Sequence, residues 1–440
     1  MTLEEKITTK NITIGVIGLG YVGLPLAVEY AATGFNTIGI DVDPKKVAMI
    51  NKGKNYIDDV DDAMLKSAVK DGNLSAEDHY RSVKKMDVVF ICVPTPFTET
   101  KDPDISYIVA ATEGILLGLR KGQIIILKST TFPNTTEGYV LPILERSGMK
   151  VGKDFYLAFS PERIDPGNKQ FNTANTPTVV GGVTKTCTKL ASLVTAQVID
   201  QVVEVSGPKV GEMEKLLENI FRSVNIALVN ELAQLCDRME GVDMWEVIEA
   251  AKTKPFGFMP FYPGPGIGGH CILIDPYYLS WIARKYDFQT NFINLAAETN
   301  EGMPFYVKNM IFRQLGLMPV AMRDANILML GVAFKRDVDD TRHSPALRIM
   351  EILLEDNVRK LHYNDPWVPE VQVNGKTFRS RKLTPALLNR MDVVVITTDH
   401  SEYDYDMIVR HAKVVIDTRN ATKKIKGRKS HVTVLGDGKK

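Results

Sequence analysis

The chain has 440 residues, with 54 Lys or Arg and 53 Asp or Glu, so its formal net charge is +1 at pH 7. This balance gives no electrostatic basis for binding nucleic acid or an acidic membrane surface. The length predicts about three domains. The polar N-terminus and the lack of an apolar run of about 20 residues favour a cytoplasmic protein with no membrane partner. Four cysteines, at positions 92, 187, 236 and 271, form no CxxC pair. We therefore predict no metal site and no disulfide framework.

The first third of the chain alternates short apolar runs with amphipathic stretches. Strands buried on both faces and separated by helices predict a parallel, doubly wound α/β sheet. The predicted strands are Ile12–Ile17, Thr37–Ile40, Val88–Val93 and Ile124–Lys128, with Tyr156–Phe159, Thr178–Val180 and Gln197–Val203 extending the sheet.

A GxGxxG motif follows the first predicted strand and begins an amphipathic stretch. This context is typical of a dinucleotide fingerprint, in which glycines let the backbone approach a pyrophosphate at a helix N-terminus. The alternative is a structural glycine-rich turn in another doubly wound fold. The predicted cofactor-binding residues of this loop are Gly18, Gly20, Tyr21, Val22 and Gly23.

An acidic residue, Asp41, follows the second strand at the expected distance. Its carboxylate suits ribose hydroxyls and would repel a 2′-phosphate, so we predict NAD rather than NADP. Asp43 is a competing acid, and Lys46 is expected near the adenosine side or as a solvated helix lysine. Pro94 and Thr95 follow the Val88–Val93 strand, and Thr130 follows the next. All three lie where ligands bind in open α/β sheets, although a hydroxyl there could simply cap a helix.

A long helix is predicted from about Pro208 to Gly241, because apolar residues recur at helical spacing. Such a helix could join two domains or form a dimer interface. Lys215 and Asn219 are four residues apart and share a helix face. From the residues alone, a solvated polar face is the simpler interpretation.

The segment Lys254–Cys271, dense in Pro, Gly and aromatic residues, cannot be a regular helix. Loops of this length inside compact domains are usually functional. Cys271 stands beside two glycines, so a thiolate there would be sterically accessible to a substrate carbon, and Asp275 follows four residues later. The alternative for Cys271 is a packing role, which we expect for the other three cysteines.

Strand and helix patterns alternate again after about Asn326 and predict a second Rossmann-like domain. Its helix is expected at Ser344–Leu354, with Ser344 as N-cap and Pro345 at the first helical position. The run MDVVVI from Met391 repeats MDVVFI from Met86. The basic C-terminal segment predicts a solvated terminus. The predicted domains are an NAD-binding domain over 1–205, a central helical domain over 206–320 and a Rossmann-like domain over 321–440.

Six ordered motifs give the chain a likeness to a known family. They are GLGYVGLP, KSTT, SPERIDPG, GEMEKLLENIFRSVNIALVNELA, FYPGPGIGGHCILIDPYYL and FKRDVDDTRHSPAL. Together they resemble the UDP-glucose/UDP-mannose dehydrogenase family of nucleotide-sugar dehydrogenases over nearly the whole chain. SPERIDPGN with FYPGPGIGGHC is more similar to the branch that oxidises UDP-N-acetylhexosamines. The chain has Pro166 where UDP-glucose enzymes typically carry a second glutamate.

The resemblance implies a four-electron oxidation of the C6 alcohol of UDP-N-acetylglucosamine to a carboxylate, with two NAD⁺ used in turn. Cys271 would form a thiohemiacetal and then a thioester. Asp275, with Thr130, would activate water, and Glu162 would assist proton transfer. Lys215 and Asn219 would stabilise the oxyanion.

The same resemblance implies the remaining binding residues. Arg342 is expected near the diphosphate or the cofactor, and Arg163 near the N-acetyl sugar. The other residues expected to bind the UDP-sugar, besides Glu162, Lys215 and Asn219, are Phe258, Phe261, Tyr262, Gly264, Phe334, Lys335 and Arg419. The family is usually dimeric through the long helix, so we expect a homodimer or a larger homo-oligomer.

Three alternatives stay open. The same chemistry could act on UDP-N-acetylmannosamine, UDP-N-acetylgalactosamine or UDP-glucose. A two-electron hydroxyacid dehydrogenase would explain the fingerprint but would leave Cys271 and the last domain unexplained. A non-enzymatic NAD-sensing module would not explain why Cys271, Asp275, Lys215 and Asn219 occur together.

Overall fold

The computed structural model describes residues 1–440 apart from 58–59, 99, 165–170, 270, 428 and 440, and for 271, 273 and 274 it describes only the backbone. Residue contacts divide the chain into two compact units. The first comprises Met1–Glu218 and Tyr277–Phe288, and the second Asn219–Pro276 and Gln289–Lys440. The three-domain division at residues 205 and 320 stays a prediction.

The first unit contains, in its described part, an eight-stranded sheet ordered β3-β2-β1-β4-β5-β6-β7-β8. Its first six strands follow the Rossmann order, and of the pairs in the sheet β6 and β7 alone run antiparallel. The strands are β1 (Thr13–Ile17), β2 (Asn36–Ile40), β3 (Leu74–Glu77), β4 (Val88–Ile91), β5 (Ile124–Leu127), β6 (Tyr156–Phe159), β7 (Thr178–Gly182) and β8 (Val202–Glu204).

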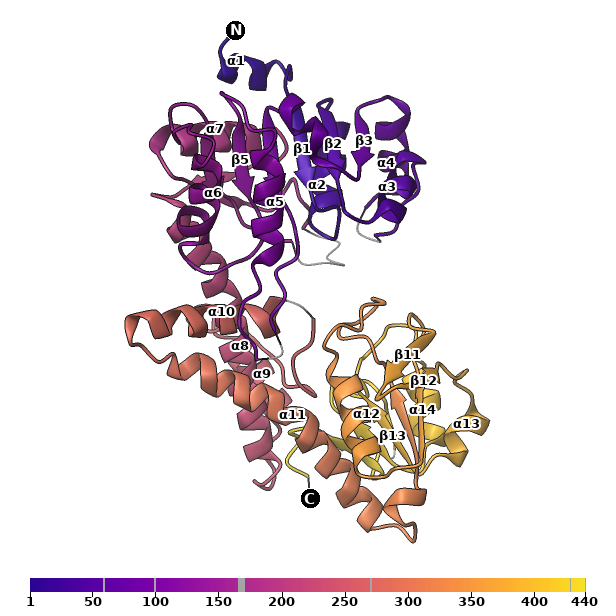
Figure 1. Ribbon diagram of the computed structural model, residues 1–440. Helices are drawn as coiled ribbons and strands as arrows, with labels where there is room; N and C mark the ends of the chain where they lie inside the picture. The colour runs from indigo at the N-terminus through magenta and orange to yellow at the C-terminus, as the bar shows by residue number, and fades with distance from the viewer. Residues whose placement is uncertain (58–59, 99, 165–170, 270, 428, 440) are drawn as a thin grey trace. The chain divides into compact units, whose positions relative to one another are not determined.

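Helices cover both faces of this sheet (Figure 1). Along β5, Ile124 and Ile126 join one core with α2 and α7, while Ile125 and Leu127 join the other with α5 and α6. The helices are α1 (Leu3–Thr8), α2 (Gly23–Ala32), α3 (Pro44–Asn51), α4 (Asp62–Lys70), α5 (Ser106–Leu116), α6 (Leu141–Glu145) and α7 (Lys185–Thr195), with η1 (Tyr80–Lys85) and η2 (Thr136–Val140).

The second unit contains, among its described residues, a five-stranded parallel sheet ordered β10-β9-β13-β14-β15 and a separate hairpin of β11 and β12. Figure 1 shows α12, α13 and α14 around this sheet. The strands are β9 (Asn326–Leu330), β10 (Lys360–Asn364), β11 (Glu370–Val373), β12 (Lys376–Arg379), β13 (Val393–Ile396), β14 (Val415–Asp417) and β15 (Val432–Val434).

The remaining helices include α8 (Pro208–Cys236), 29 residues long, and α10 (Cys271–Ala283); both contribute residues to the two units. The doubly wound α/β fold with a long central helix is thereby confirmed. Ser344 caps α12 by accepting a hydrogen bond from the N–H of Ala346 at 3.2 Å. The others are α9 (Met244–Lys252), α11 (Asn291–Gly316), α12 (Pro345–Glu355), α13 (Pro385–Arg390), α14 (Tyr405–His411), η3 (Arg284–Tyr286) and η4 (Met322–Asp324).

The repeated MDVV motif marks equivalent strands of the two sheets. β4 lies beside β1 and β13 lies beside β9. Asp87 Oδ2 accepts a hydrogen bond from the N–H of Thr13 at 2.9 Å, and Asp392 Oδ2 accepts one from Asn326 at 2.9 Å. The two copies of the motif therefore have equivalent roles, because in each the Asp accepts a hydrogen bond from the first residue of the neighbouring strand.

Two expectations about local structure are wrong. Gln197 and Val198 belong to the turn that ends α7, and the strand begins only at Val202. The C-terminal segment is not simply solvated, because β15 completes the second sheet and Leu435 is fully buried. Its carbonyl accepts a hydrogen bond from the Trp245 indole at 2.8 Å. The abundance of Lys and Gly in this segment hid the apolar residues that pack.

Candidate active site

Two glycines of the fingerprint, Gly18 and Gly23, are required by close backbone approaches, whereas Gly20 has open space around it. Gly18 has a φ of +87°, and a Cβ there would lie 2.6 Å from the carbonyl oxygen of Cys92. A Cβ on Gly23 would lie 1.8 Å from the carbonyl oxygen of Gly18. α2 begins at Gly23 with Val22 as N-cap and no capping side chain. A helix N-terminus without a side-chain cap suits a diphosphate, so this loop fits a dinucleotide.

Asp41 lies at the end of β2 with part of its hydrogen-bonding capacity unused. It is 7% exposed, and its carboxylate accepts hydrogen bonds from Leu19 N–H at 2.8 Å and Asp43 N–H at 2.9 Å. A carboxylate has about four lone-pair sites, so it can still accept ribose hydroxyls. Lys46 Nζ lies 3.7 Å from the same carboxylate. Tyr56 donates to the carbonyl of Leu19 at 2.6 Å, a contact that the sequence did not indicate.

The loops that follow β4 and β5 are tied together. Ser129 donates to the carbonyl of Val93 at 2.7 Å. Thr95, which follows Pro94, is 6% exposed, and its carbonyl accepts a hydrogen bond from Tyr278 of α10. Thr130, which follows Ser129, is half-buried. The structure thus gives the predicted cofactor loops fixed positions within the first unit.

Glu162 pairs with a buried lysine that the sequence analysis did not single out. Lys128 is 3% exposed, and its Nζ lies 3.5 Å from Glu162 Oε2. Glu162 Oε1 accepts hydrogen bonds from the N–H groups of Arg163 and Ile164, at 2.8 and 3.0 Å. A charged residue directly after the apolar strand β5 was the available signal. Pro166 lies outside the described residues.

Arg163 is held by two carboxylates of α8. Its Nη2 lies 3.3 Å from Glu214 and forms a hydrogen bond with Glu218. Its Nη1 donates to the carbonyl of Pro177 at 2.8 Å. Burial, a hydrogen bond with Glu218 and the charge of Glu218 raise the pKa of Glu214 to about 7. Arg163 would therefore have to give up some of these contacts in order to bind the sugar.

The polar pair on α8 is buried, whereas part of its apolar stripe, including Leu217, is exposed. Lys215 is 8% and Asn219 5% exposed, so a solvated polar face is the wrong interpretation. Asn219 Nδ2 donates to Asp275 Oδ2 at 2.5 Å, and Asp275 is 2% exposed. Cys271 begins α10, one turn before Asp275. Its side chain lies outside the described part.

The other three cysteines lie in the protein interior. Cys92, Cys187 and Cys236 are buried. Burial raises the pKa of the Cys92 thiol to about 12, since a thiolate there would lose its hydration. Burial also raises the pKa of the Cys236 thiol, so thiolate formation at neutral pH is disfavoured at both Cys92 and Cys236.

The loop before Cys271 packs within the second unit. Phe261 lies edge-on to Phe221, with ring centroids 5.7 Å apart. Tyr262 stacks on Trp245 and donates to Glu249 at 2.6 Å. Among the aromatic residues predicted to line the pocket, Phe258 is 41% exposed.

The glycines of this loop meet the predicted nucleotide-binding residues. A Cβ on Gly264 would lie 2.6 Å from Arg419 Nη1. A Cβ on Gly268 would lie 2.6 Å from Phe334 Cβ. The N–H of Gly269 donates to the carbonyl of Arg342 at 2.9 Å. The structure therefore brings Gly264, Arg419 and Phe334 together. Close packing explains the glycines.

The charged residues of this region have partners. Arg342 is exposed and binds both carboxylate oxygens of Asp340, with its Nε 3.0 Å from each. Arg419 Nε lies 3.4 Å from Asp399 Oδ1. Lys335 follows Phe334 and is half-buried. Lys335 lies on the loop after β9 and Arg419 lies two residues after β14, at the strand ends where a phosphate could bind.

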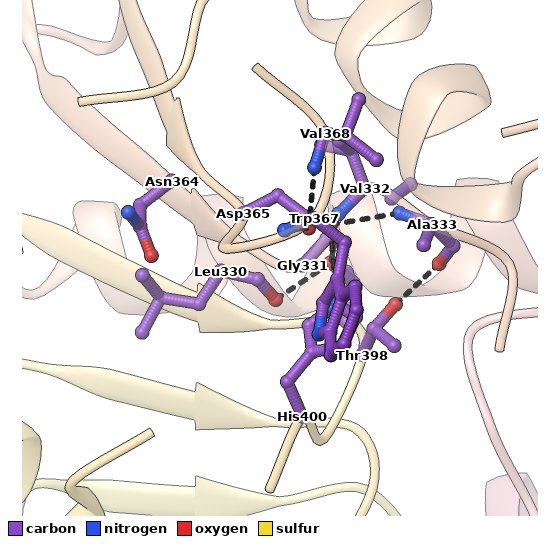
Figure 2. Close-up of polar contacts among 12 residues, drawn as sticks. Leu330, Gly331, Val332, Ala333, Asn364, Asp365, Trp367, Val368, Thr398 and His400 are labelled. Carbon is purple, nitrogen blue, oxygen red and sulfur yellow. Dashed lines mark hydrogen bonds and ion pairs between the residues drawn. The ribbon is translucent and has the colours of Figure 1, made fainter. Parts of the chain in front are cut away.

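A buried cluster at the same strand ends was missed by the sequence analysis. Figure 2 shows the carboxylate of Asp365 bonded to backbone amides, with His400 and Thr398 nearby. Asp365 follows β10 and His400 follows β13. Burial alone would raise the pKa of Asp365, but hydrogen bonds from His400, Ala333 and Val332 outweigh it and lower that pKa. An acid at the end of the second strand, as in the first domain, was the available signal.

These features define an NAD-dependent dehydrogenase of nucleotide sugars. The chain belongs to the UDP-glucose/GDP-mannose dehydrogenase family; the second substrate in the family's name is thus GDP-mannose rather than UDP-mannose. The family's NAD binding domain matches residues 12–199, its central domain 209–302 and its UDP binding domain 328–424.

Two relatives are equally similar to the chain. It is 35% identical over 396 residues to UDP-N-acetyl-D-glucosamine 6-dehydrogenase of Pseudomonas aeruginosa, covering 90% of this chain and 92% of the relative. It is 35% identical over 417 residues to UDP-N-acetyl-D-mannosamine dehydrogenase of Pyrococcus horikoshii, covering 93% and 96%. The solved structure of a UDP-D-ManNAc dehydrogenase from Pyrococcus horikoshii has a TM-score of 0.87 and 32% identity, over 97% of this chain and 100% of that one. No helix in the described part of the chain is long and apolar enough to cross a membrane.

Proposed function

We propose that the protein oxidises the C6 alcohol of UDP-N-acetylglucosamine to a carboxylate through covalent intermediates on Cys271. The observation that carries this proposal is the 2.5 Å hydrogen bond between Asn219 and Asp275, one turn into the helix that Cys271 begins. The same chemistry on UDP-N-acetylmannosamine is the second candidate, because a relative with that name is equally identical to the chain. UDP-N-acetylgalactosamine and UDP-glucose are the further candidates.

The first oxidation converts the alcohol to an aldehyde. NAD⁺, when bound, would supply the hydride acceptor, and the glycine loop from Gly18 with Asp41 would hold it. The hydroxyl proton of the alcohol leaves to water. Lys215 and Asn219 stabilise negative charge on the substrate oxygen, and their burial strengthens that electrostatic effect.

The second oxidation proceeds on Cys271. The thiolate adds to the aldehyde carbon and forms a thiohemiacetal, which keeps the reactive carbonyl bound. Loss of a hydride and a proton from the thiohemiacetal, for which a second NAD⁺ would be the hydride acceptor, gives a thioester. Water then hydrolyses the thioester to the acid and the free thiol. Asp275 orients this water with Thr130, and Glu162 assists proton transfer.

The UDP group binds at the carboxyl ends of the second sheet. Phe334 and Lys335 contact the nucleotide, and Arg419 contacts the diphosphate. The close approach of Gly264 to Arg419 supports a shared pocket. Phe258, Phe261 and Tyr262, which belong to the loop before Cys271, line one side of this pocket.

We also propose a homodimer in which α8 of one chain covers α8 of a second. Large apolar side chains form an exposed stripe along this helix at helical spacing. Leu217 is 59% exposed and Leu228 53%. The other exposed members are Val210, Met213, Phe221 and Leu235.

The test is the number of NADH produced per UDP-N-acetylglucosamine consumed, with mass analysis of the product. We expect two NADH and a uronic acid from the unchanged chain. Cys271→Ser should form no acid, whereas Cys187→Ser should still give two NADH, because among the described residues that buried sulfur accepts hydrogen bonds from Leu157 and Thr184 alone.

Each other result has a definite meaning. If the chain does not oxidise UDP-N-acetylglucosamine but oxidises another UDP-sugar, that sugar replaces the proposed substrate. One NADH with a released aldehyde, or acid formation by Cys271→Ser, would overturn the covalent mechanism.

A further inference from the structure

The proposed mechanism does not use the imidazole of His400 or the carboxylate of Asp365. These two groups lie where three loops meet. The loops follow β9, β10 and β13, and the carboxyl ends of adjacent parallel strands share one edge of a sheet. His400 and Asp365 are 0% and 2% exposed. Figure 2 shows both beside the backbone of Val332 and Ala333.

Groups of the protein occupy all the hydrogen-bond acceptor sites of the Asp365 carboxylate. Its Oδ2 accepts from the N–H of Val332 at 2.7 Å and of Ala333 at 3.0 Å. Its Oδ1 accepts from the N–H of Trp367 at 2.9 Å and of Val368 at 3.1 Å. With His400 as a fifth donor, the roughly four lone-pair sites of a carboxylate are filled. Asp365 therefore holds the loop after β9 and is not available to a ligand.

His400 connects this acid to the far end of the same loop. Its Nε2 lies 3.1 Å from Asp365 Oδ2, and its Nδ1 accepts the N–H of Asp337 at 3.0 Å. Since a backbone N–H can only donate, Nδ1 carries no proton, and the ring proton lies on Nε2, facing Asp365. Ser401 adds a second tie, because its hydroxyl donates to Asp337 at 2.7 Å. The loop is thus fixed at Val332, Ala333 and Asp337.

Phe334 and Lys335 lie between these fixed points. Phe334 also meets the glycines before Cys271, since a Cβ on Gly269 would lie 2.9 Å from its ring. We propose that His400 and Asp365 are positioning residues that hold Phe334 and Lys335 in the conformation that binds the UDP group. This inference rests on the proposed function, in which these two residues contact the nucleotide.

The two ring nitrogens can be tested separately. The side-chain amide nitrogen of Gln can take the place of Nε2, and the side-chain oxygen of Asn that of Nδ1. His400→Gln keeps a donor for Asp365, whereas His400→Asn keeps only the acceptor for Asp337. We expect His400→Asn and His400→Gln each to weaken UDP binding by about three- to tenfold, because each variant breaks one of the two hydrogen bonds that connect Asp365 to Asp337.

The experiment is calorimetric titration of each full-length variant with UDP and, separately, with NAD⁺. The expected result is a change in UDP affinity with NAD⁺ affinity within twofold of the unchanged chain. The Michaelis constant for the UDP-sugar should rise while kcat at saturation stays within threefold. Unchanged UDP binding by both His400 variants, or a parallel loss of NAD⁺ binding, would overturn the inference.

A second variant covers the case in which the His400 variants do not fold. Thr398 donates to the carbonyl of Ala333 at 2.6 Å, and Thr398→Val removes only that hydroxyl. We expect about threefold weaker UDP binding with NAD⁺ binding unchanged; unaltered UDP binding would refute the positioning role. If the unchanged chain binds no UDP, the proposed function fails first, and that result is distinct from a loss confined to the variants.

Discussion

Glu212 accepts two hydrogen bonds from Thr136, one from its backbone N–H at 2.8 Å and one from its hydroxyl at 2.7 Å. Its other oxygen accepts the N–H of Asn134 at 2.6 Å, and the side chain is fully buried. This carboxylate of α8 therefore fixes the segment that follows Thr130, one turn before Lys215 on the same helix.

Replacing Glu212 by Ala should destabilise the protein by about 2–4 kcal/mol, because two backbone donors lose their acceptor in the interior. The midpoint of urea unfolding measures this loss. Glu137→Gln is the matched control, because Glu137 lies on the same segment and forms an ion pair with Lys209 at the surface, at 3.1 Å. That change should cost less than about 1 kcal/mol. Similar midpoints for the two variants would contradict the assigned role of Glu212.

Asp41→Asn should weaken NAD⁺ binding about tenfold, because the amide keeps one acceptor and loses the charge that favours ribose hydroxyls. The preference for NAD⁺ over NADP⁺ should fall as well. Fluorescence titration with both cofactors checks this. Asp43→Asn is the control, since Asp43 caps α3 by accepting from Lys45 N–H at 2.8 Å and Asn caps equally well. A larger effect at 43 than at 41 would reverse the assignment.

Glu214 predicts a pH dependence. Its pKa is raised to about 7 by burial, by its hydrogen bond with Glu218 and by the charge of Glu218. A group whose pKa is raised on folding contributes stability that is complete below its unfolded pKa, about 4.3, and is lost as the pH rises through its folded value. The free energy of unfolding of Glu214→Gln, relative to that of the unchanged chain, should therefore rise by on the order of 1 kcal/mol or more between pH 4.5 and 8.

Urea unfolding at several pH values across that range tests the expectation. Glu231→Gln, an exposed change on the same helix, should shift stability equally at every pH. A constant difference between Glu214→Gln and the unchanged chain would show that the proton is not held at this site.

Leu217→Glu combined with Leu228→Glu should give a monomer, because two charges would be buried without partners in the proposed interface. Sedimentation velocity at micromolar concentration measures the change. Arg222→Ala is the control, because Arg222 is exposed on another face of α8 and should leave the dimer intact. A monomer from the unchanged chain would refute the interface outright.

Features written in consecutive residues could be predicted from the sequence. Apolar runs predicted the buried strands. The glycines from Gly18 to Gly23 predicted the turn into α2, and Ser344 with Pro345 predicted the start of α12. Each depends on local propensity and periodicity, which a single sequence carries.

Features that depend on distant partners could not be predicted. Burial of Lys215 and Asn219 follows from packing around α8, and helical spacing alone does not say which face is covered. The contact between Asn219 and Asp275 joins residues 56 positions apart. Asp365 and His400 meet only because β10 and β13 flank β9. Such contacts are created by the sheet order.

The acids that end β2 and β10 show how one scaffold can keep or lose a ligand. Asp41 has acceptor sites left, whereas Asp365 has none, although each binds the turn after the first strand of its own sheet. No shift of the backbone is needed for this difference: one imidazole and a few extra amide donors are enough. The position of an acid in a Rossmann-like sheet is therefore a poor guide to nucleotide preference until the donors already satisfied by it are counted.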